Sequence, residues 1–266
     1  MSYNYYMEIV KKDPYMLQYV KEQTYEMCLE AVNKYGHLFK YVQEQTHELC
    51  LIAIKQDPSM IMYIKEQTPE MCMIAVKKYG KFLEYIKEQS HDICLEAVKE
   101  NGSALTYVKE QAPEICMAAV KNFGFSIGSV KEQTPELCLE AVSNAGQALK
   151  YVKEQDPDIC LAAVKQDPVA LQFVNEQTEE ICIEAVKRNG RVIQYVKKKT
   201  PGICLAAVKQ YGRSLGHVKK DMQTREVCVE AVKQDGMALE YVKVQTPEIC
   251  RIAVQQNSGA LKYVRI

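Results

Sequence analysis

Residues 156–177 read DPDICLAAVKQDPVALQFVNEQ, and variants of these 22 residues follow one another along the chain. The cysteine of each variant aligns them. Successive cysteines are 22 residues apart, except for a separation of 24 between Cys204 and Cys228, and they stand at positions 28, 50, 72, 94, 116, 138, 160, 182, 204, 228 and 250. A fixed period of this size indicates a repeat array. Tyr6 takes the cysteine position of one further unit at the start, so the sequence predicts twelve units.

Each unit is predicted to contain two helices. The first begins at Thr, Ser or Asp, often followed by Pro and an acid, as in residues 134–136, and these residue types start α-helices. Apolar residues then recur at helical spacing until a glycine such as Gly146, which suits a left-handed helix cap. Asp-Pro replaces that step at 13–14, 57–58 and 167–168 and equally stops the helix. The second, shorter helix is predicted over residues 148–155.

A helix pair of this size cannot bury its own apolar face, whereas stacked copies can. The sequence therefore predicts an all-α fold, an α-solenoid of about twelve 22-residue helix-turn-helix repeats that forms an elongated superhelix. It predicts a single repeat domain over residues 1–266. The expected units are roughly 2–23, 24–45, 46–67, 68–89, 90–111, 112–133, 134–155, 156–177, 178–199, 200–223, 224–245 and 246–266.

The consensus sequence of the unit, close to YVKEQTPEICLEAVKxxGxAL, resembles that of a known family. It is similar to short helical repeats, catalogued as a domain of unknown function, that are abundant in giant DNA viruses of amoebae. The resemblance covers the chain from about Tyr6 to Val264. It implies a giant-virus protein that acts inside an amoebal cell, in the host cytoplasm, and it brings no activity or catalytic residue with it.

Charge and hydropathy narrow the function classes. Lys+Arg and Asp+Glu both number 34, so the formal net charge is zero, which argues against a generally basic nucleic-acid binder. No apolar run approaches the roughly 18 residues that a membrane span requires. The first residues lack the cationic and apolar segments of a secretory signal. We therefore expect no association with a membrane.

The eleven cysteines are expected to be small core residues. All but Cys250, which Arg251 follows, lie between apolar residues; no Cys-x-x-Cys pair occurs, and one thiol per unit cannot complete a tetrahedral zinc site. Neighbouring units would also hold their cysteines too far apart for a disulfide. The sequence thus predicts no disulfides, no metal site and no cofactor. An odd set of unpaired cysteines favours a reducing, intracellular compartment.

Three other positions recur. Alanine stands three residues after every cysteine, from Ala31 to Ala253, where a larger side chain would separate neighbouring helices. Glutamine stands five residues before the cysteine, from Gln23 to Gln177, and is expected to bond loop backbone groups between units. An aromatic ladder is expected to pack at the core edge between second helices, with base stacking as the alternative; it comprises Tyr19, Tyr41, Tyr63, Tyr85, Tyr107, Tyr151, Phe173, Tyr195, Tyr241 and Tyr263.

Residues 187–220 depart most strongly from the repeat. They contain no Asp or Glu and ten cations: Lys187, Arg188, Arg191, Lys197, Lys198, Lys199, Lys209, Arg213, Lys219 and Lys220. The first three cations, with Lys209 and Arg213, fall at turns within units, and the other five fall at turns between units, on the opposite edge. We take the ten as the candidate partner-binding site, suited to an acidic protein surface or a phosphate backbone. The alternative is a solvated stretch balanced by the acidic residues of 156–186.

Smaller departures occur elsewhere. Two extra residues between His217 and Cys228 predict a bulge or a bend, and the acid that usually follows Pro is Gly202 in the same region. Gly128 and Ser129 replace the usual residues at the end of a second helix, which indicates a hinge, a pocket or a local irregularity. Ile52 and Ile74, at equivalent outward-leaning positions, are expected to add a small apolar contact surface.

The sequence contains no glycine-rich phosphate loop, metal triad, nucleophile elbow or paired-carboxylate motif. It therefore predicts no catalytic residues and no enzymatic activity. The function it favours is a protein-interaction scaffold with a protein partner. The alternative is binding of nucleic acid or another polyanion through the basic stretch 187–220.

Overall fold

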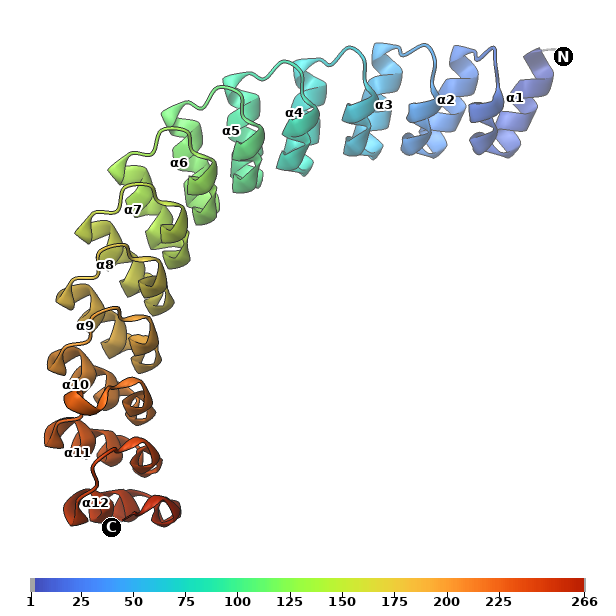
Figure 1. Ribbon diagram of the computed structural model, residues 1–266. Helices are drawn as coiled ribbons and strands as arrows, with labels where there is room; N and C mark the ends of the chain where they lie inside the picture. The colour runs from blue at the N-terminus through green and yellow to red at the C-terminus, as the bar shows by residue number, and fades with distance from the viewer. Residues whose placement is uncertain (1–2, 266) are drawn as a thin grey trace. The chain divides into compact units, whose positions relative to one another are not determined.

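The computed structural model describes residues 3–265, in which ten-residue α-helices alternate with short 3₁₀-helices and no strand occurs (Figure 1). The α-helices are α1 (Tyr3–Lys12), α2 (Tyr25–Lys34), α3 (His47–Gln56), α4 (Pro69–Lys78), α5 (His91–Glu100), α6 (Pro113–Asn122), α7 (Pro135–Asn144), α8 (Pro157–Gln166), α9 (Glu179–Arg188), α10 (Pro201–Gln210), α11 (Arg225–Gln234) and α12 (Pro247–Gln256). The 3₁₀-helices are η1 (Pro14–Tyr19), η2 (Gly36–Tyr41), η3 (Pro58–Tyr63), η4 (Gly80–Tyr85), η5 (Gly102–Tyr107), η6 (Gly124–Ser129), η7 (Gly146–Tyr151), η8 (Pro168–Phe173), η9 (Gly190–Tyr195), η10 (Gly212–His217), η11 (Lys220–Met222), η12 (Gly236–Tyr241) and η13 (Ser258–Tyr263).

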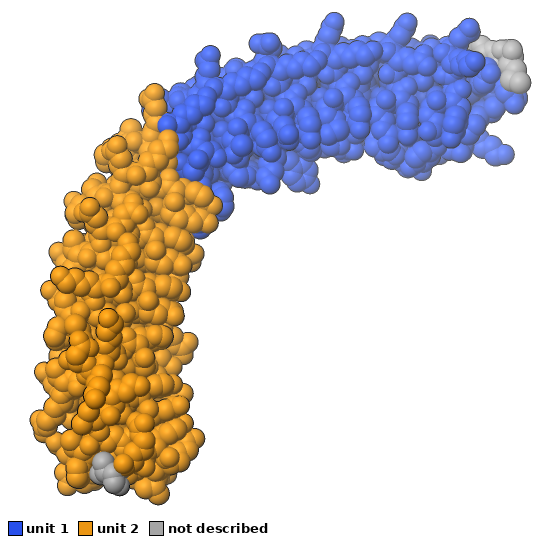
Figure 2. Space-filling view, in the orientation of Figure 1, with its two compact units in different colours: residues 1–131 blue, residues 132–266 orange. Residues whose placement is uncertain are grey.

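The chain forms two compact units, residues 1–131 and 132–266 (Figure 2). Within each unit, every α-helix contacts the α-helices of adjacent repeats, and every six-residue 3₁₀-helix contacts its counterpart in the next repeat. Each unit therefore has an α layer and a 3₁₀ layer, and each repeat buries its apolar face against copies of itself. This arrangement confirms the predicted α-solenoid. Within residues 3–265, every helix is too short to cross a bilayer.

The α-helices begin where the sequence predicted. Thr134 precedes α7, and its side-chain oxygen accepts a hydrogen bond of 3.3 Å from the Leu137 N–H in the first turn. Pro135 and Glu136 follow, where a missing N–H costs nothing and a negative charge faces the positive helix end. Ala112, before α6, is the exception and makes no side-chain cap bond.

The helices α2 to α11 bury the same four positions, and α12 buries the first three of them. In α8 these are Ile159, Cys160, Ala163 and Val164. The alanine three residues after the cysteine is completely buried in every repeat, from Ala31 to Ala253, as predicted. The 3₁₀-helices add Leu149 and its equivalents, and each fully buried leucine contributes about 1.5–3 kcal/mol.

The second helix of each unit differs from the prediction. It is a six-residue 3₁₀-helix, as in η7, rather than an α-helix over residues 148–155. It starts at the glycine itself, and it ends where the Val152 N–H bonds to the Leu149 carbonyl. Residues 153–155 then connect it to the next α-helix. Within this connection, the Gln155 side chain forms hydrogen bonds with the backbone of the next repeat.

The glycine that opens most 3₁₀-helices is not a left-handed cap, because no glycine among the described residues has a positive φ. A Cβ on Gly80 would lie 2.1 Å from the carbonyl oxygen of Ala97 in the next repeat, and one on Gly190 would lie 2.5 Å from the Ala207 oxygen. Real Cβ contacts are never this short. At Gly80 and Gly190, therefore, two repeats approach backbone to backbone and leave no room for a Cβ.

The N–H of the same glycine donates to the last residue of the next α-helix. Gly146 bonds to Gln166 Oε1, and Gly190 bonds to Gln210 Oε1, both at 2.6 Å. Three repeats have Pro at this step and so lack the N–H. In the repeats that follow Pro14, Pro58 and Pro168, the α-helix ends in a cation instead of an acceptor, namely Lys34, Lys78 and Arg188. The acceptor is thus paired with the donor across the repeat boundary.

Candidate functional site

The ten cations of 187–220 lie on two edges of the array, as the sequence predicted. Lys187 and Arg188 end α9, Arg191 lies in η9, Lys209 lies in the last turn of α10, and Arg213 lies in η10. These five residues flank the steps from an α-helix to its 3₁₀-helix. The other five flank the steps from a 3₁₀-helix to the next α-helix, at Lys197, Lys198, Lys199, Lys219 and Lys220.

Several of these cations are engaged within the protein. Arg188 pairs with Glu184 at 2.6 Å, and Arg213 pairs with Asp235 at 2.7 Å, a hydrogen bond that raises the pKa of the Arg213 guanidinium further. The Arg191 guanidinium lies 4.6 Å from the centre of the Tyr211 ring. Arg191 and Arg213 therefore join neighbouring repeats, the Arg188 pair lies within α9, and all three arginines on this edge already have a partner in the protein.

Two lysines on the opposite edge bond to backbone carbonyls. Lys197 Nζ donates to the Val174 and Asn175 carbonyls of the preceding repeat at 3.0 and 2.7 Å. Lys199 Nζ donates to the Val196 carbonyl at 3.2 Å. Five exposed side chains have no hydrogen-bond or ion-pair partner among the described residues, namely those of Lys187, Lys198, Lys209, Lys219 and Lys220. The structure thus reduces the candidate site to Lys187 and Lys209 on one edge and three lysines on the other.

Lys187 and Lys209 border a shallow groove between α9 and α10. The groove measures about 470 Å³, and Ile183, Leu205 and Ala206 form its apolar floor. Gly202 lies at the end of the groove near the start of α10. The sequence singled out Gly202 as a lost acid but not as an opening. The signal was present, because all other repeats that contain the cysteine carry Glu or Asp at this position.

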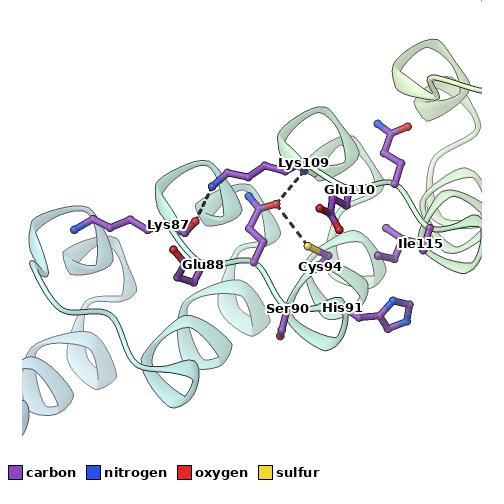
Figure 3. Close-up of a pocket in the computed structure, with 11 residues that line it drawn as sticks. Lys87, Glu88, Ser90, His91, Cys94, Lys109, Glu110 and Ile115 are labelled. Atoms are coloured by element: carbon purple, nitrogen blue, oxygen red, sulfur yellow. Dashed lines mark hydrogen bonds between the residues drawn. The ribbon is translucent and has the colours of Figure 1, made fainter.

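A second pocket lies in the other unit, between the starts of α5 and α6 (Figure 3). It measures about 530 Å³, and Ser90, His91, Cys94 and Lys109 are among its lining residues. Several of the side chains that line it already form hydrogen bonds within the protein. Lys109 Nζ donates to the Lys87 carbonyl at 2.6 Å, and Gln89 Oε1 accepts from the Lys109 N–H at 3.0 Å. This pocket therefore lies at the contact between two repeats, where Lys109 and Gln89 form hydrogen bonds with backbone groups of the neighbouring repeat.

The glutamine ladder behaves as the sequence predicted. Gln155 Nε2 donates to the Phe173 carbonyl of the next repeat at 3.0 Å, and its Oε1 accepts from the Asn175 N–H at 3.0 Å. Lys199 stands at this position one repeat before the two-residue insertion. The insertion forms the short helix η11, and Gln223 behind it again bonds to the backbone of the next repeat.

Six residues of the aromatic ladder are half-buried, as a core-edge position implies, and four are exposed. Tyr19 is 70% exposed, and Tyr63, Tyr85 and Tyr151 are exposed by 38–43%. Their backbone carbonyls, rather than their rings, join the repeats, as the Gln45 and Gln67 amides show by bonding to Tyr63 and Tyr85. Base stacking stays an untested alternative.

The other departures keep the repeat backbone. Gly128 and Ser129 end a regular 3₁₀-helix, η6, and the Ser129 carbonyl accepts from the Gln111 amide at 2.9 Å like any ladder tyrosine. Ile52 and Ile74 are half-buried on α3 and α4, so the apolar contact surface they were expected to form stays a prediction.

All eleven cysteines are buried and free. Burial raises the pKa of every thiol, to about 11 for Cys160 and Cys182. A raised thiol pKa disfavours the thiolate, which is the form that acts as a nucleophile or metal ligand. No cluster of three or more potential metal ligands occurs in the described part of the chain.

The raised thiol pKa predicts a loss of stability at alkaline pH. Because the folded protein favours the protonated thiol, the stabilisation is complete below the unfolded pKa near 9 and is lost as the pH rises toward 11. We expect the melting temperature to fall between pH 9 and 11, and to fall less in a Cys160→Ala/Cys182→Ala variant. Circular dichroism melts at several pH values measure both. Equal falls in the two proteins would contradict the assignment to the thiols.

Comparison with known proteins gives one match. A family model described as Domain of unknown function (DUF4116) matches overlapping segments of about two repeats each, at residues 46–90, 68–111, 134–178, 156–200, 178–223, 200–245 and 224–265. Together these segments cover more than half of the chain. No curated protein and no solved structure matches it.

Proposed function

Since the chain belongs to the helical repeat family described as Domain of unknown function (DUF4116), we propose its role from the structure: a non-enzymatic scaffold that binds a protein partner. One observation carries this proposal. The residue two positions after each cysteine is half-buried in every repeat, yet its chemistry changes along the array. It is Glu in five repeats, Ile in three and Ala in three: Glu30, Ile52, Ile74, Glu96, Ala118, Glu140, Ala162, Glu184, Ala206, Glu230 and Ile252.

The contrast with the buried positions supports this role. The alanine three residues after each cysteine never changes, because packing allows nothing larger there. The neighbouring half-buried position is free of that restriction, so its variation changes the surface without disturbing the core. A constant framework with a variable outer surface is what α-solenoids use to recognise partners.

Binding of a polyanion through 187–220 is the competing function. Five of its ten cations already have partners within the chain, and the remaining five are divided between two edges. A phosphate backbone that followed one edge would meet at most three unpartnered lysines. The charge available to it is therefore smaller than the sequence indicates.

The two functions respond differently to salt and nuclease. We would immobilise the full chain, expose it to amoebal cell extract with and without nuclease, and wash it at about 0.5 M salt, where exposed charges are screened. A scaffold retains a protein after nuclease treatment and at high salt, and an Ile52→Glu/Ile74→Glu or Ala206→Glu variant retains less. A polyanion binder retains only nucleic acid, and it loses that nucleic acid at high salt and on Lys198→Glu/Lys219→Glu/Lys220→Glu substitution. That second result would overturn the scaffold.

The same proposal includes a cellular setting. Free thiols in such numbers are typical of proteins in reducing compartments, and all eleven cysteines of this chain are free. With the resemblance of the repeat to those of giant DNA viruses of amoebae, this supports a viral protein that acts in the cytoplasm of the host cell. Fractionation of infected amoebae with detection of the chain tests the location.

A further inference from the structure

The groove between α9 and α10 differs from the surface of the other cysteine-containing repeats at Gly202, where those repeats carry Glu or Asp. Its floor is apolar, formed by Ile183, Leu205 and Ala206, all half-buried rather than sealed. One rim ends in Lys187 and Lys209, on consecutive repeats at the same helical position. An open apolar floor beside two cations is suited to a ligand that is both apolar and acidic.

Gly202 leaves one end of the groove open. An added Cβ there would meet only the Glu179 side chain at 3.4 Å and the Thr200 hydroxyl at 3.8 Å, so nothing in the packing requires glycine. Ala206 similarly stands where five other repeats have Glu. Helix α10 thus lacks an acid at a position that is acidic in every other cysteine-containing repeat and at a second that is acidic in half of them, and both positions line the groove.

The charges give the groove a direction. At the end near Gly202 stands the Glu179 carboxylate, which accepts a hydrogen bond from the Thr200 hydroxyl. At the other end the Lys187 and Lys209 side chains are exposed and have no partner among the described residues. An acidic group is attracted to the lysine end and repelled from the Glu179 end.

We propose that this groove binds a short acidic amphipathic segment of the partner protein, which places an apolar side chain on the floor and a carboxylate between Lys187 and Lys209. The inference rests on the proposed scaffold function and names the chemistry of its partner. An apolar face laid in a groove with charged residues at its rim is a common mode of peptide recognition. The lysines fix the orientation of the segment, and the apolar floor supplies the contact that survives high salt.

The test selects ligands without assuming their sequence. A library of random peptides of about 12 residues, the length of a few helical turns, is selected on the full chain and counter-selected on the Gly202→Glu variant. That variant restores the residue found in most other repeats, so we expect it to keep the fold, which a circular dichroism melt checks. The expected peptides combine Asp or Glu with Leu, Ile or Phe. Enrichment of basic or uncharged peptides, or no enrichment, would overturn the groove.

The enriched peptide is then measured by fluorescence polarisation. We expect at least tenfold weaker binding to Gly202→Glu and to Lys187→Glu/Lys209→Glu. Binding to the matched control Lys219→Glu/Lys220→Glu, on the opposite edge, should be unchanged. Equal weakening by the control would show a general charge effect and contradict the site. If the Gly202→Glu variant retains the partner protein from the cell extract as well as the native chain does, the scaffold function is supported but the groove is not its binding site. If no partner is retained by any form of the chain, the scaffold itself falls.

Discussion

We expect the Gly190→Ala variant to lose about 2–3 kcal/mol of folding free energy, the usual cost of forcing extra volume into a close-packed contact. Its Cβ would lie 2.5 Å from the Ala207 carbonyl oxygen and 2.9 Å from Gln210 Oε1. Since Ala207 is completely buried, neither repeat can move without losing packing elsewhere. For a chain of this size, the loss corresponds to a fall in melting temperature of about 4–12 °C, measured by circular dichroism.

Gly202→Ala is the matched control in the same unit. The new Cβ would meet nothing nearer than Glu179 Oε1 at 3.4 Å, an ordinary contact. Gly202 also lies in α10, where alanine is favoured over glycine by up to about 1 kcal/mol. This variant should match or slightly exceed the native melting temperature. If the two variants lost equal stability, or if Gly190→Ala were neutral, the close approach between repeats would not be the reason for glycine.

Much of this fold could be predicted from local sequence. The helix cap at Thr134 and the proline that follows it depend on interactions within one helix. The apolar positions of α8 follow from the spacing of one helix face: Ile159, Cys160, Ala163 and Val164. Because these signals repeat every 22 residues, the stacking of units followed from the need to bury that face. The glutamine ladder was predicted for the same reason, since a loop between helices has backbone groups to satisfy.

Several of the features that were missed involve contacts between two repeats. A left-handed cap and a close backbone approach both require glycine, and only the position of Ala207 distinguishes them at Gly190. The second helix was expected to be α-helical because its apolar spacing is compatible with either helix type over six residues. The sequence also overestimated the number of cations that are available in the candidate site. Counting charges identified ten cations, but Arg191, Arg213 and Lys197 are engaged by a ring, a carboxylate and backbone carbonyls of neighbouring repeats.

One signal between repeats was nevertheless present in the sequence. Wherever the step is glycine and another repeat follows, the next α-helix ends in Gln, Glu or Asn, and wherever it is proline, that helix ends in Lys or Arg. The structure explains the association. The buried glycine N–H needs a hydrogen-bond acceptor, which the end of the next α-helix provides, whereas proline has no N–H and needs no acceptor. Correlated changes between consecutive repeats of a single chain thus contain information on contacts that each repeat alone lacks.

This pairing makes Gln210→Arg the second strongly destabilising change. It removes Gln210 Oε1 from the buried Gly190 N–H, 2.6 Å away, and leaves that donor unsatisfied. An unsatisfied buried donor costs about 1–3 kcal/mol. Size does not account for the effect, because Arg188 occupies the same position one repeat earlier. Urea unfolding followed by circular dichroism measures the loss.

Arg188→Gln provides the opposite exchange in the neighbouring repeat. The step it faces is Pro168, which has no N–H, so the new amide gains no essential partner. The variant loses only the exposed pair with Glu184, which contributes about 0–1 kcal/mol. We therefore expect Gln210→Arg to cost clearly more than Arg188→Gln, although each places in one repeat the residue that the other tolerates. Equal costs would mean that the glycine N–H is satisfied in another way and that the acceptor follows the glycine for a reason other than hydrogen bonding.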